Sequence, residues 1–155
     1  MEFLAALEHT GLVRLLKGSF YVYPIVNALH VAAIGALFTS VLLMDLRLLG
    51  ALKLVAGEPF LALMRRVALL AFLGAVITGL ALFSVRATEY AAMPIFLAKM
   101  GLIVLAGLNF LLFLWLARKR PADKAPSPAQ QASALVSMLL WTSVLLAGRF
   151  IGFVA

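Results

Sequence analysis

Four long apolar runs fill most of this chain and are separated by shorter polar segments. The runs cover about residues 21–49, 67–85, 93–117 and 133–155. A helix needs about 20 apolar residues to cross a bilayer, and each run is close to that length or longer. The chain shows no alternating pattern of the kind that β-strands have, no internal repeat and no second domain. The pattern therefore predicts an all-α integral membrane protein, with helices at about residues 21–49, 60–86, 93–118 and 132–154 in a single membrane domain of residues 1–155.

The segment before the first run has a different pattern. Its apolar residues cluster near positions 4, 7, 12, 15 and 16, a spacing that suits a helix lying in the membrane interface. We therefore predict an N-terminal interfacial amphipathic helix at about residues 2–17. The segment also carries Glu2, Glu8, His9, Arg14 and Lys17, and it lacks the apolar core of a cleavable signal peptide. The first membrane helix is thus expected to act as its own insertion signal.

The connections between the runs set the predicted topology. Residues 86–94 form a short connection ending in Pro94, a residue suited to the first turn of a helix. Residues 118–132 are rich in proline and polar side chains and show no apolar period, as is typical of a linker. Short connections make consecutive helices antiparallel neighbours. We predict an up-down-up-down four-helix bundle with a cytoplasmic linker at about residues 118–132.

Composition supports a membrane protein and narrows its chemistry. Hydrophobic residues make up 65% of the chain and charged residues 12%, which leaves more apolar surface than a soluble domain of 155 residues could bury. The absence of cysteine excludes disulfides, thiolate metal sites, iron–sulfur clusters and c-type haem attachment. The six acidic residues lie mostly near the ends of the runs, with no nucleophile and base within reach. A hydrolytic enzyme is therefore not expected.

The distribution of basic residues predicts the orientation of the bundle. The net charge of +7 would suggest a nucleic-acid partner in a soluble protein, but here the basic residues lie at helix ends, where they meet lipid headgroups. The expected partner is thus the lipid bilayer. Eight Lys and Arg residues flank the first and third connections, and five lie on the opposite side. The positive-inside rule then predicts a multi-pass protein of the bacterial inner membrane with periplasmic N- and C-termini.

Polar residues inside the apolar runs are the candidates for function, because they are costly to place in a membrane. At about 1.5 Å of rise per residue, His30 lies about 12 Å from the outer end of the first membrane helix, with Asn27 one turn above it. Thr78 lies about 10 Å deep on the second helix, and Lys99 and Arg149 lie about 9 Å deep on the third and fourth. All four helices thus place a polar group in one outer layer.

These residues allow several roles. The long apolar stems of Lys99 and Arg149 could let both side chains snorkel to the outer headgroups. His30 could join the helices by a hydrogen bond to Asn27, Thr78 or a backbone carbonyl. It could instead be a metal or haem ligand, or part of a proton relay.

Other polar residues of the runs are interpreted as structural. Asp45 and Arg47 could pair at the cytoplasmic exit of the first membrane helix, at the water interface. Packing and hydrogen bonding between helices account for the remaining positions, which are Asn109, Ser133, Ser137 and Trp141.

Several motifs spread over nearly the whole chain resemble those of one bacterial family. The most specific are the His30 helix with its Asp-Leu-Arg-Leu-Leu-Gly exit at residues 45–50, and the terminal Gly-Arg-Phe-Ile at residues 148–151. Further matching positions are Tyr23, Pro24, Asn27, Thr78, Gly79, Phe83, Lys99 and Asn109. With these motifs the chain resembles a family of small four-helix integral membrane proteins of unknown function. The resemblance implies a fold and a set of characteristic positions, but no activity.

The Ala-Leu-His-Val segment at residues 28–31 is also similar to the first helix of membrane haem proteins of the copper-resistance D and protoporphyrinogen-oxidase types. This likeness implies a b-type haem ligated by His30, with Lys99, Arg149 and Arg86 near its propionates. A low-spin b haem takes two axial ligands, and the chain has only His9 and His30. His9 could approach if the N-terminal helix folds over the outer mouth of the bundle. A five-coordinate haem, or one shared between subunits, is the alternative.

Two hypotheses of different classes follow. In the first, the protein is a b-type haem redox protein that passes electrons between a quinone or membrane partner and a periplasmic partner. In the second, it has no cofactor and is an interaction subunit, and Asn27, His30, Thr78, Lys99 and Arg149 form a hydrogen-bonded core or an anionic-ligand pocket. A homo-oligomer, including an oligomeric channel, is compatible with both hypotheses.

Overall fold

The computed structural model describes residues 2–52, 57–118 and 125–154. Within these ranges every secondary-structure element is a helix, which confirms the all-α prediction. The elements are α1 (Glu2–Glu8), α2 (Gly11–Gly18), α3 (Val22–Leu48), α4 (Gly57–Val85), α5 (Ala87–Ala92), α6 (Pro94–Arg118) and α7 (Pro128–Val154). The central part of the predicted linker, residues 119–124, lies outside the described residues.

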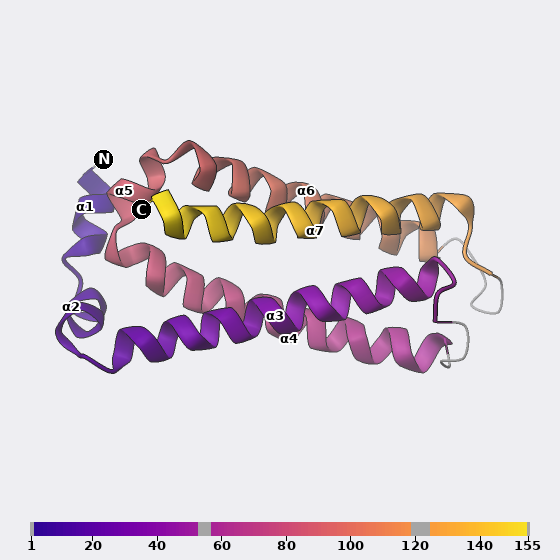
Figure 1. Ribbon diagram of the computed structural model, residues 1–155, viewed down its shortest axis with the longest axis horizontal. Coiled ribbons are helices and arrows are strands. Elements are labelled where there is room, and N and C mark those ends of the chain that lie inside the picture. The colour runs from indigo at the N-terminus through magenta and orange to yellow at the C-terminus, as the bar shows by residue number, and fades with distance from the viewer. Residues whose placement is uncertain (1, 53–56, 119–124, 155) are drawn as a thin grey trace.

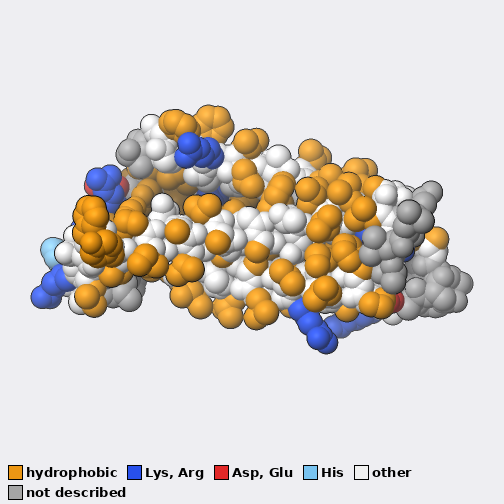
Figure 2. Space-filling view, turned by 60° about the horizontal axis from the view of Figure 1, so that its bottom comes forward, with side chains coloured by type: hydrophobic (Ala, Val, Ile, Leu, Met, Phe, Trp, Pro, Cys, Tyr) orange, Lys and Arg blue, Asp and Glu red, His pale blue; other side chains and the backbone are white. Residues whose placement is uncertain are grey.

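The four long helices α3, α4, α6 and α7 are each long and apolar enough to cross a membrane. Their outward surface agrees with this role, because large apolar side chains such as Leu70 and Leu139 are 71% and 70% exposed. A soluble monomer rarely leaves so much contiguous apolar surface in water. Figure 2 shows hydrophobic side chains along the length of the bundle, with Lys and Arg side chains toward its two ends. The chain is a multi-pass membrane protein in contact with the lipid bilayer.

Two of the long helices start earlier than predicted. Helix α4 begins at Gly57 and α7 at Pro128, whereas the apolar pattern placed these starts at about 60 and 132. At α7 the cause is a capping box. The Ser127 N–H donates to Gln130 Oε1 (2.8 Å), and the Gln130 N–H donates to Ser127 Oγ (3.2 Å). This reciprocal pair satisfies two backbone donors and extends α7 beyond its apolar run.

The four helices are arranged as two hairpins joined along one seam. Helix α3 packs along α4, α6 packs along α7, and α3 also packs against α7 (Figure 1). Among the described residues, α4 and α6 do not form a comparable contact. A small core of Leu37, Val41 and Ala68, with Trp141 packed against it, lies where α3, α4 and α7 meet. The two hairpins thus contact each other mainly through α3 and α7.

The N-terminal segment forms two short helices where one was predicted. The break falls at His9 and Thr10, between α1 and α2. Both helices lie at the end of the bundle that also holds α5 and the C-terminus, and they contact α3, α4 and α5 (Figure 1). Val13 and Leu16 of α2 are 0% and 4% exposed, so this helix is anchored by buried apolar side chains. We call this end the outer end and the opposite end the inner end, after the predicted orientation.

Helix α5 is a feature that the apolar pattern did not predict. It lies in the short connection between α4 and α6. An aromatic stack holds it in place: the ring centroid of Phe96 lies 5.3 Å from that of Phe83 and 5.9 Å from that of Tyr90. Three consecutive elements are therefore fastened to one another at the outer end.

Candidate functional site

The outer layer brings His30 of α3 and Thr78 of α4 together. Nδ1 of His30 lies 2.9 Å from the Thr78 hydroxyl, which lies 2.6 Å from the Gly74 carbonyl oxygen. The single hydroxyl proton of Thr78 goes to the Gly74 carbonyl, so the hydroxyl must accept a hydrogen bond from Nδ1–H of His30. This assignment leaves Nε2 of the neutral imidazole as an unprotonated acceptor.

Gly79 makes room for the His30 ring. A Cβ atom built on Gly79 would lie 3.0 Å from Cε1 of His30 and 3.6 Å from Nδ1. Real Cβ atoms rarely approach other atoms so closely, so a side chain at this position would push the imidazole away from Thr78. The absence of a side chain at residue 79 therefore allows α3 and α4 to approach closely at His30.

Lys99 of α6 has a similar relation to α7. A Cβ atom built on Gly148 would lie 3.3 Å from Nζ of Lys99, so the Lys99 side chain lies directly against this glycine. Lys99 is partly buried and close enough to His30 to act on it electrostatically. Arg149 follows Gly148 but is exposed, and its guanidinium carbon lies 4.7 Å from the centroid of the Phe153 ring. Its position is thus explained by a cation–π contact at the outer surface.

The remaining predicted site residues lie apart from this cluster. Asn27 is exposed on α3, and no hydrogen bond joins it to His30 among the described residues. Arg86 forms an ion pair with Glu89 (3.4 Å), with both side chains more than half exposed. His9 is exposed at the junction of α1 and α2, where its carbonyl oxygen accepts a hydrogen bond from Arg14. Residues 2–52, 57–118 and 125–154 contain no group of three or more His, Cys, Asp or Glu side chains able to hold a metal ion.

The N-terminal helices are fastened to the outer end by Glu8. Its Oε1 accepts hydrogen bonds from the Thr88 backbone N–H (2.9 Å) and from the Thr88 hydroxyl (2.7 Å). These two bonds hold the pKa of the Glu8 carboxyl below its ordinary value of 4.5. The link between α1 and α5 therefore depends on an ionised Glu8.

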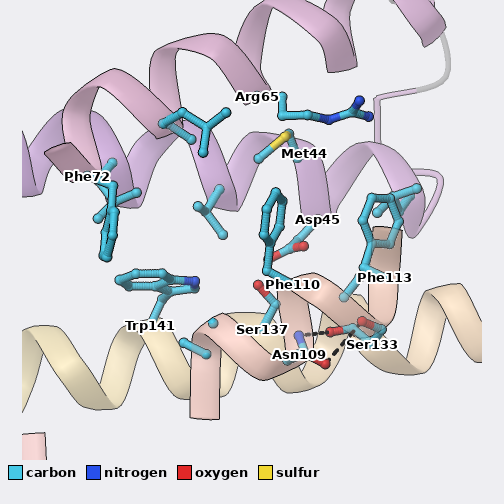
Figure 3. Close-up of a pocket in the computed structure, with 18 of the residues that line it drawn as sticks. Met44, Asp45, Arg65, Phe72, Asn109, Phe110, Phe113, Ser133, Ser137 and Trp141 are labelled. Carbon is cyan, nitrogen blue, oxygen red and sulfur yellow. Dashed lines mark hydrogen bonds between the residues drawn. The ribbon is translucent and has the colours of Figure 1, made fainter. Parts of the chain in front are cut away.

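A cavity of about 180 Å³ lies in the inner half of the bundle, between the two hairpins. We call it the inner cavity. Figure 3 shows Trp141 and Phe72 toward one end of it and Phe113 toward the other, with Asp45, Ser137 and Phe110 between them. Side chains from all four long helices line it, and among them are Leu37, Val41, Met44, Asp45, Arg65, Ala68, Leu69, Phe72, Ala106, Asn109, Phe110, Phe113, Ser133, Ser137 and Trp141.

The inner cavity contains polar atoms that lack partners. Asp45 is 6% exposed, and its Oδ2 has no hydrogen-bond partner among the described residues. Ser137 of α7 is the hydrogen-bonding neighbour of this carboxyl group. On the facing helix α4, Nε of Arg65 is likewise buried without a partner, and Figure 3 shows its guanidinium turned toward the inner end. A buried polar atom without a hydrogen bond is costly, and such an atom in a cavity calls for an explanation.

A second polar pair on the cavity wall is fully connected. Nδ2 of Asn109 donates to the Ser133 carbonyl oxygen (3.0 Å), and the Ser133 hydroxyl donates to Asn109 Oδ1 (3.1 Å). These two bonds join α6 to α7 within one hairpin, as the sequence analysis predicted for Asn109 and Ser133. They use one of the two N–H groups of the Asn109 amide.

The apolar pattern of the sequence does not predict the inner cavity, because it places Asp45 at the water interface. The structure corrects that interpretation: Asp45 is buried, and Arg47 lies against Gly57 at the start of α4. Asp45 is enclosed because α4 and α7 pack against α3 at its level, where Arg65 of α4 and Ser137 of α7 line the same cavity. The Ser-Pro-Ala-Gln sequence at residues 127–130, a capping box with proline at the first helical position, was the signal that could have revealed the extension of α7.

Comparison with known proteins identifies the family of this chain. Neither a comparison with curated proteins nor one with solved structures finds a match. The likeness of the first membrane helix to membrane haem proteins therefore stays a prediction. The profile of a family of unknown function (DUF6644) matches residues 5–154, nearly the whole chain, and the protein belongs to this family.

Proposed function

We propose that the protein is a membrane binding protein that holds a small lipophilic molecule in the inner cavity, between its two hairpins. The observation that carries this proposal is the coincidence of a cavity with a buried carboxylate oxygen that lacks a partner. The proposed location is the bacterial inner membrane, with both termini in the periplasm. The excess of basic residues around the first and third connections supports this orientation.

The size and walls of the inner cavity suit an apolar ring. A cavity of about 150 Å³ lined by apolar side chains is large enough to bind benzene. The inner cavity, at about 180 Å³, has room for a six-membered ring with small substituents. Its walls are mostly aliphatic and aromatic, which is typical of ligand pockets that carry a few polar groups for orientation.

A route from the bilayer supports the same proposal. Residues of α4 and α6 line the inner cavity, although these two helices do not pack closely against each other. Two of the lining residues, Leu69 and Phe72 on α4, are 54% and 38% exposed, so the rim of the cavity meets the lipid-facing surface. A molecule dissolved in the membrane can therefore reach the cavity from the side of α4 and α6.

Trp141 provides a reporter for the experiment that tests this function. The variant Trp115→Phe leaves Trp141 as the single tryptophan, and toluene is titrated into this variant in detergent while the fluorescence is recorded. We expect a saturable change in Trp141 emission. Ala106, which lines the cavity and is 1% exposed, is then changed to Leu to fill the space. This change should weaken the response at least tenfold.

The control is Ala98→Leu, the same substitution at an exposed position of α6 that does not line the cavity. It should bind toluene as the parent does. Circular dichroism shows whether both variants keep their helices. A response that is linear, or equally strong in both variants, would mean that toluene acts through the detergent and would refute the proposed function.

A haem at His30 is a second candidate function, favoured by the state of the imidazole. With Nδ1–H donated to the Thr78 hydroxyl, Nε2 is the unprotonated nitrogen, the arrangement found in histidines whose second nitrogen binds a metal. His30 is thus the candidate axial ligand, and Lys99 is the predicted propionate partner that lies near it. Of the other two predicted partners, Arg149 lies over the Phe153 ring and Arg86 is paired with Glu89. His9 as the second axial ligand has no support from the described contacts. A bound b haem would supply one-electron redox chemistry, with a quinone or membrane partner and a periplasmic partner.

The haem candidate has its own test. The protein is produced in haem-replete cells, and its visible spectrum is recorded before and after reduction with dithionite, beside His30→Ala. Stoichiometric haem that is lost in the variant would support His30 as a ligand. A colourless protein from the same cells would remove this candidate and leave the proposal for the inner cavity unaffected.

A further inference from the structure

We propose that the ligand of the inner cavity is a neutral, membrane-soluble phenol or hydroquinone whose hydroxyl group donates a hydrogen bond to Oδ2 of Asp45. This inference rests on the binding function proposed above and adds the chemical class of the ligand. It is argued from the charges, the unused hydrogen-bonding groups and the aromatic walls of the cavity.

The charges favour a neutral ligand. Among the described residues that line the cavity, Asp45 is the only acid and Arg65 the only base, so the formal charges of the lining cancel. A cation would be attracted by Asp45 but repelled by Arg65. An anion would be attracted by Arg65 but repelled by Asp45. At the low effective dielectric constant of a protein interior, either unbalanced charge is expensive. A neutral polar group avoids both penalties.

The unused groups favour a hydroxyl. Oδ2 of Asp45 needs a donor, because it is buried without a partner. The Asn109 amide, on the wall of the same cavity, has a second N–H that can donate a hydrogen bond. A hydroxyl both donates and accepts, and a hydroquinone carries two such groups on opposite sides of its ring. A simple hydrocarbon would leave the carboxylate unsatisfied, which makes it the poorer ligand.

The aromatic walls favour a ring over a flexible alcohol. Phe72, Phe110, Phe113 and Trp141 all line the cavity, and Figure 3 shows them distributed around Asp45. Aromatic pairs in stacked or edge-to-face arrangements gain energy beyond the burial of their area. The volume of about 180 Å³ admits a single ring with its substituents, whereas the tail of a lipid would have to remain outside.

The experiment compares p-cresol with p-xylene, two molecules of the same shape in which one methyl group replaces the hydroxyl. Both are titrated into the Trp115→Phe protein, and binding is read from Trp141. The comparison is repeated in Asp45→Leu, which has no acceptor and a larger, apolar side chain, so the ratio of the two affinities is the quantity compared. The larger leucine side chain takes cavity space from both ligands alike. We therefore expect the preference for p-cresol over p-xylene to fall at least tenfold in Asp45→Leu, since hydrogen bonds to charged groups are among the strong ones. Asp45→Asn keeps an acceptor oxygen, so its preference for p-cresol over p-xylene should lie between those of the parent and of Asp45→Leu.

Glu58→Gln, at an exposed acid of α4 that does not line the cavity, is the matched control and should change neither affinity. If p-xylene binds and the preference for p-cresol does not depend on Asp45, the hydroxyl inference is wrong while the binding function stands. If benzylamine displaces p-cresol at lower concentration than p-cresol itself binds, the cavity selects cations and the inference is also wrong. If no ring binds at all, the proposed function fails with it.

Discussion

The outer and inner polar groups of this bundle differ in how far they are satisfied. In the outer layer, His30 and Thr78 are hydrogen-bonded across α3 and α4, and Lys99 lies against Gly148 across α6 and α7. Each of these contacts is made inside one hairpin, at a close approach of two helices. In the inner cavity, Asp45 faces the space between the hairpins and retains a buried oxygen without a partner.

The difference supports different roles for the two regions. A polar pair that is complete and tightly packed needs no ligand, and hydrogen bonds between membrane helices are modest but stabilising. A polar group that is buried, incomplete and next to a cavity lowers stability unless something fills the space. The outer pair thus joins α3 to α4, while a ligand of the kind proposed for the inner cavity would restore stability there.

The largest effect on this comparison should come from Gly79→Leu. The new side chain would occupy the place of the His30 ring and force α3 and α4 apart. We expect a loss of about 2–4 kcal/mol in the free energy of unfolding, from overpacking and the broken hydrogen bond. Reversible unfolding in mixed detergent measures this loss. The control is Gly101→Leu, at a glycine where an added Cβ atom would have no neighbour within 4 Å. Equal stability of the two variants would contradict the role given to Gly79.

Asp45→Leu should change stability in the opposite direction. The substitution removes a buried carboxylate oxygen without a partner and fills part of the inner cavity with apolar atoms. We expect the free energy of unfolding to rise by about 1–3 kcal/mol in the ligand-free protein. Reversible unfolding in mixed detergent measures this gain in stability. A loss of stability would mean that the carboxyl group is satisfied in the native protein and would argue against a ligand at that position.

Thr78→Val should have a smaller effect in the outer layer. Valine keeps the volume and branching of threonine but cannot accept the hydrogen bond from Nδ1–H of His30. The expected loss is about 0.5–1.5 kcal/mol, the usual range for one hydrogen bond between membrane helices. The control Thr39→Val, at an exposed position of α3, should leave the free energy of unfolding unchanged. Nitrogen-15 chemical shifts of the imidazole test the tautomer: Nδ1 should be protonated in the parent, and a parent protonated at Nε2 would refute the assignment.

The smallest effect should be a local one at Glu8. Because the folded pKa of this carboxyl lies below 4.5, its contribution is fully present above pH 4.5 and is lost as the pH falls through the lower folded value. The Thr88 backbone N–H donates to Glu8, so the protection factor of this amide in hydrogen exchange, which corrects for the intrinsic rate at each pH, should fall at acid pH. In Glu8→Gln the Thr88 amide should exchange faster at neutral pH, and its protection should depend less on pH. Protection of this amide that is independent of both pH and Glu8 would contradict the link.

The sequence predicted the fold and the contact between His30 and Thr78, for identifiable reasons. Membrane helices require long apolar runs, so α3, α4, α6 and α7 could be recognised from length and composition. His30 and Thr78 could be recognised because polar residues deep in such runs are rare and tend to meet one another. Their hydrogen bond confirms that they are neighbours, although the same reasoning also grouped Asn27 and Arg149 with them, and both of these are exposed.

The inner cavity could not be predicted in the same way. Whether Asp45 is buried depends on which helices pack side by side at its level, and this does not follow from the apolar pattern. The missing close contact between α4 and α6 is a property of tertiary packing, since all four helices are similarly apolar. The break between α1 and α2 was also missed, because the apolar positions on either side of His9 and Thr10 fit a single helix.

The arrangement as two hairpins with one seam has a consequence for how the chain assembles in the membrane. Each hairpin can complete its own helix contacts once its second helix has been inserted, so α3 and α4 can be in place before α6 and α7 leave the ribosome. The seam between α3 and α7 has to wait for the last helix of the chain. We expect newly made molecules to pass through a stage of two separate hairpins, and a pulse-labelled crosslink between α3 and α7 should form later than one between α3 and α4.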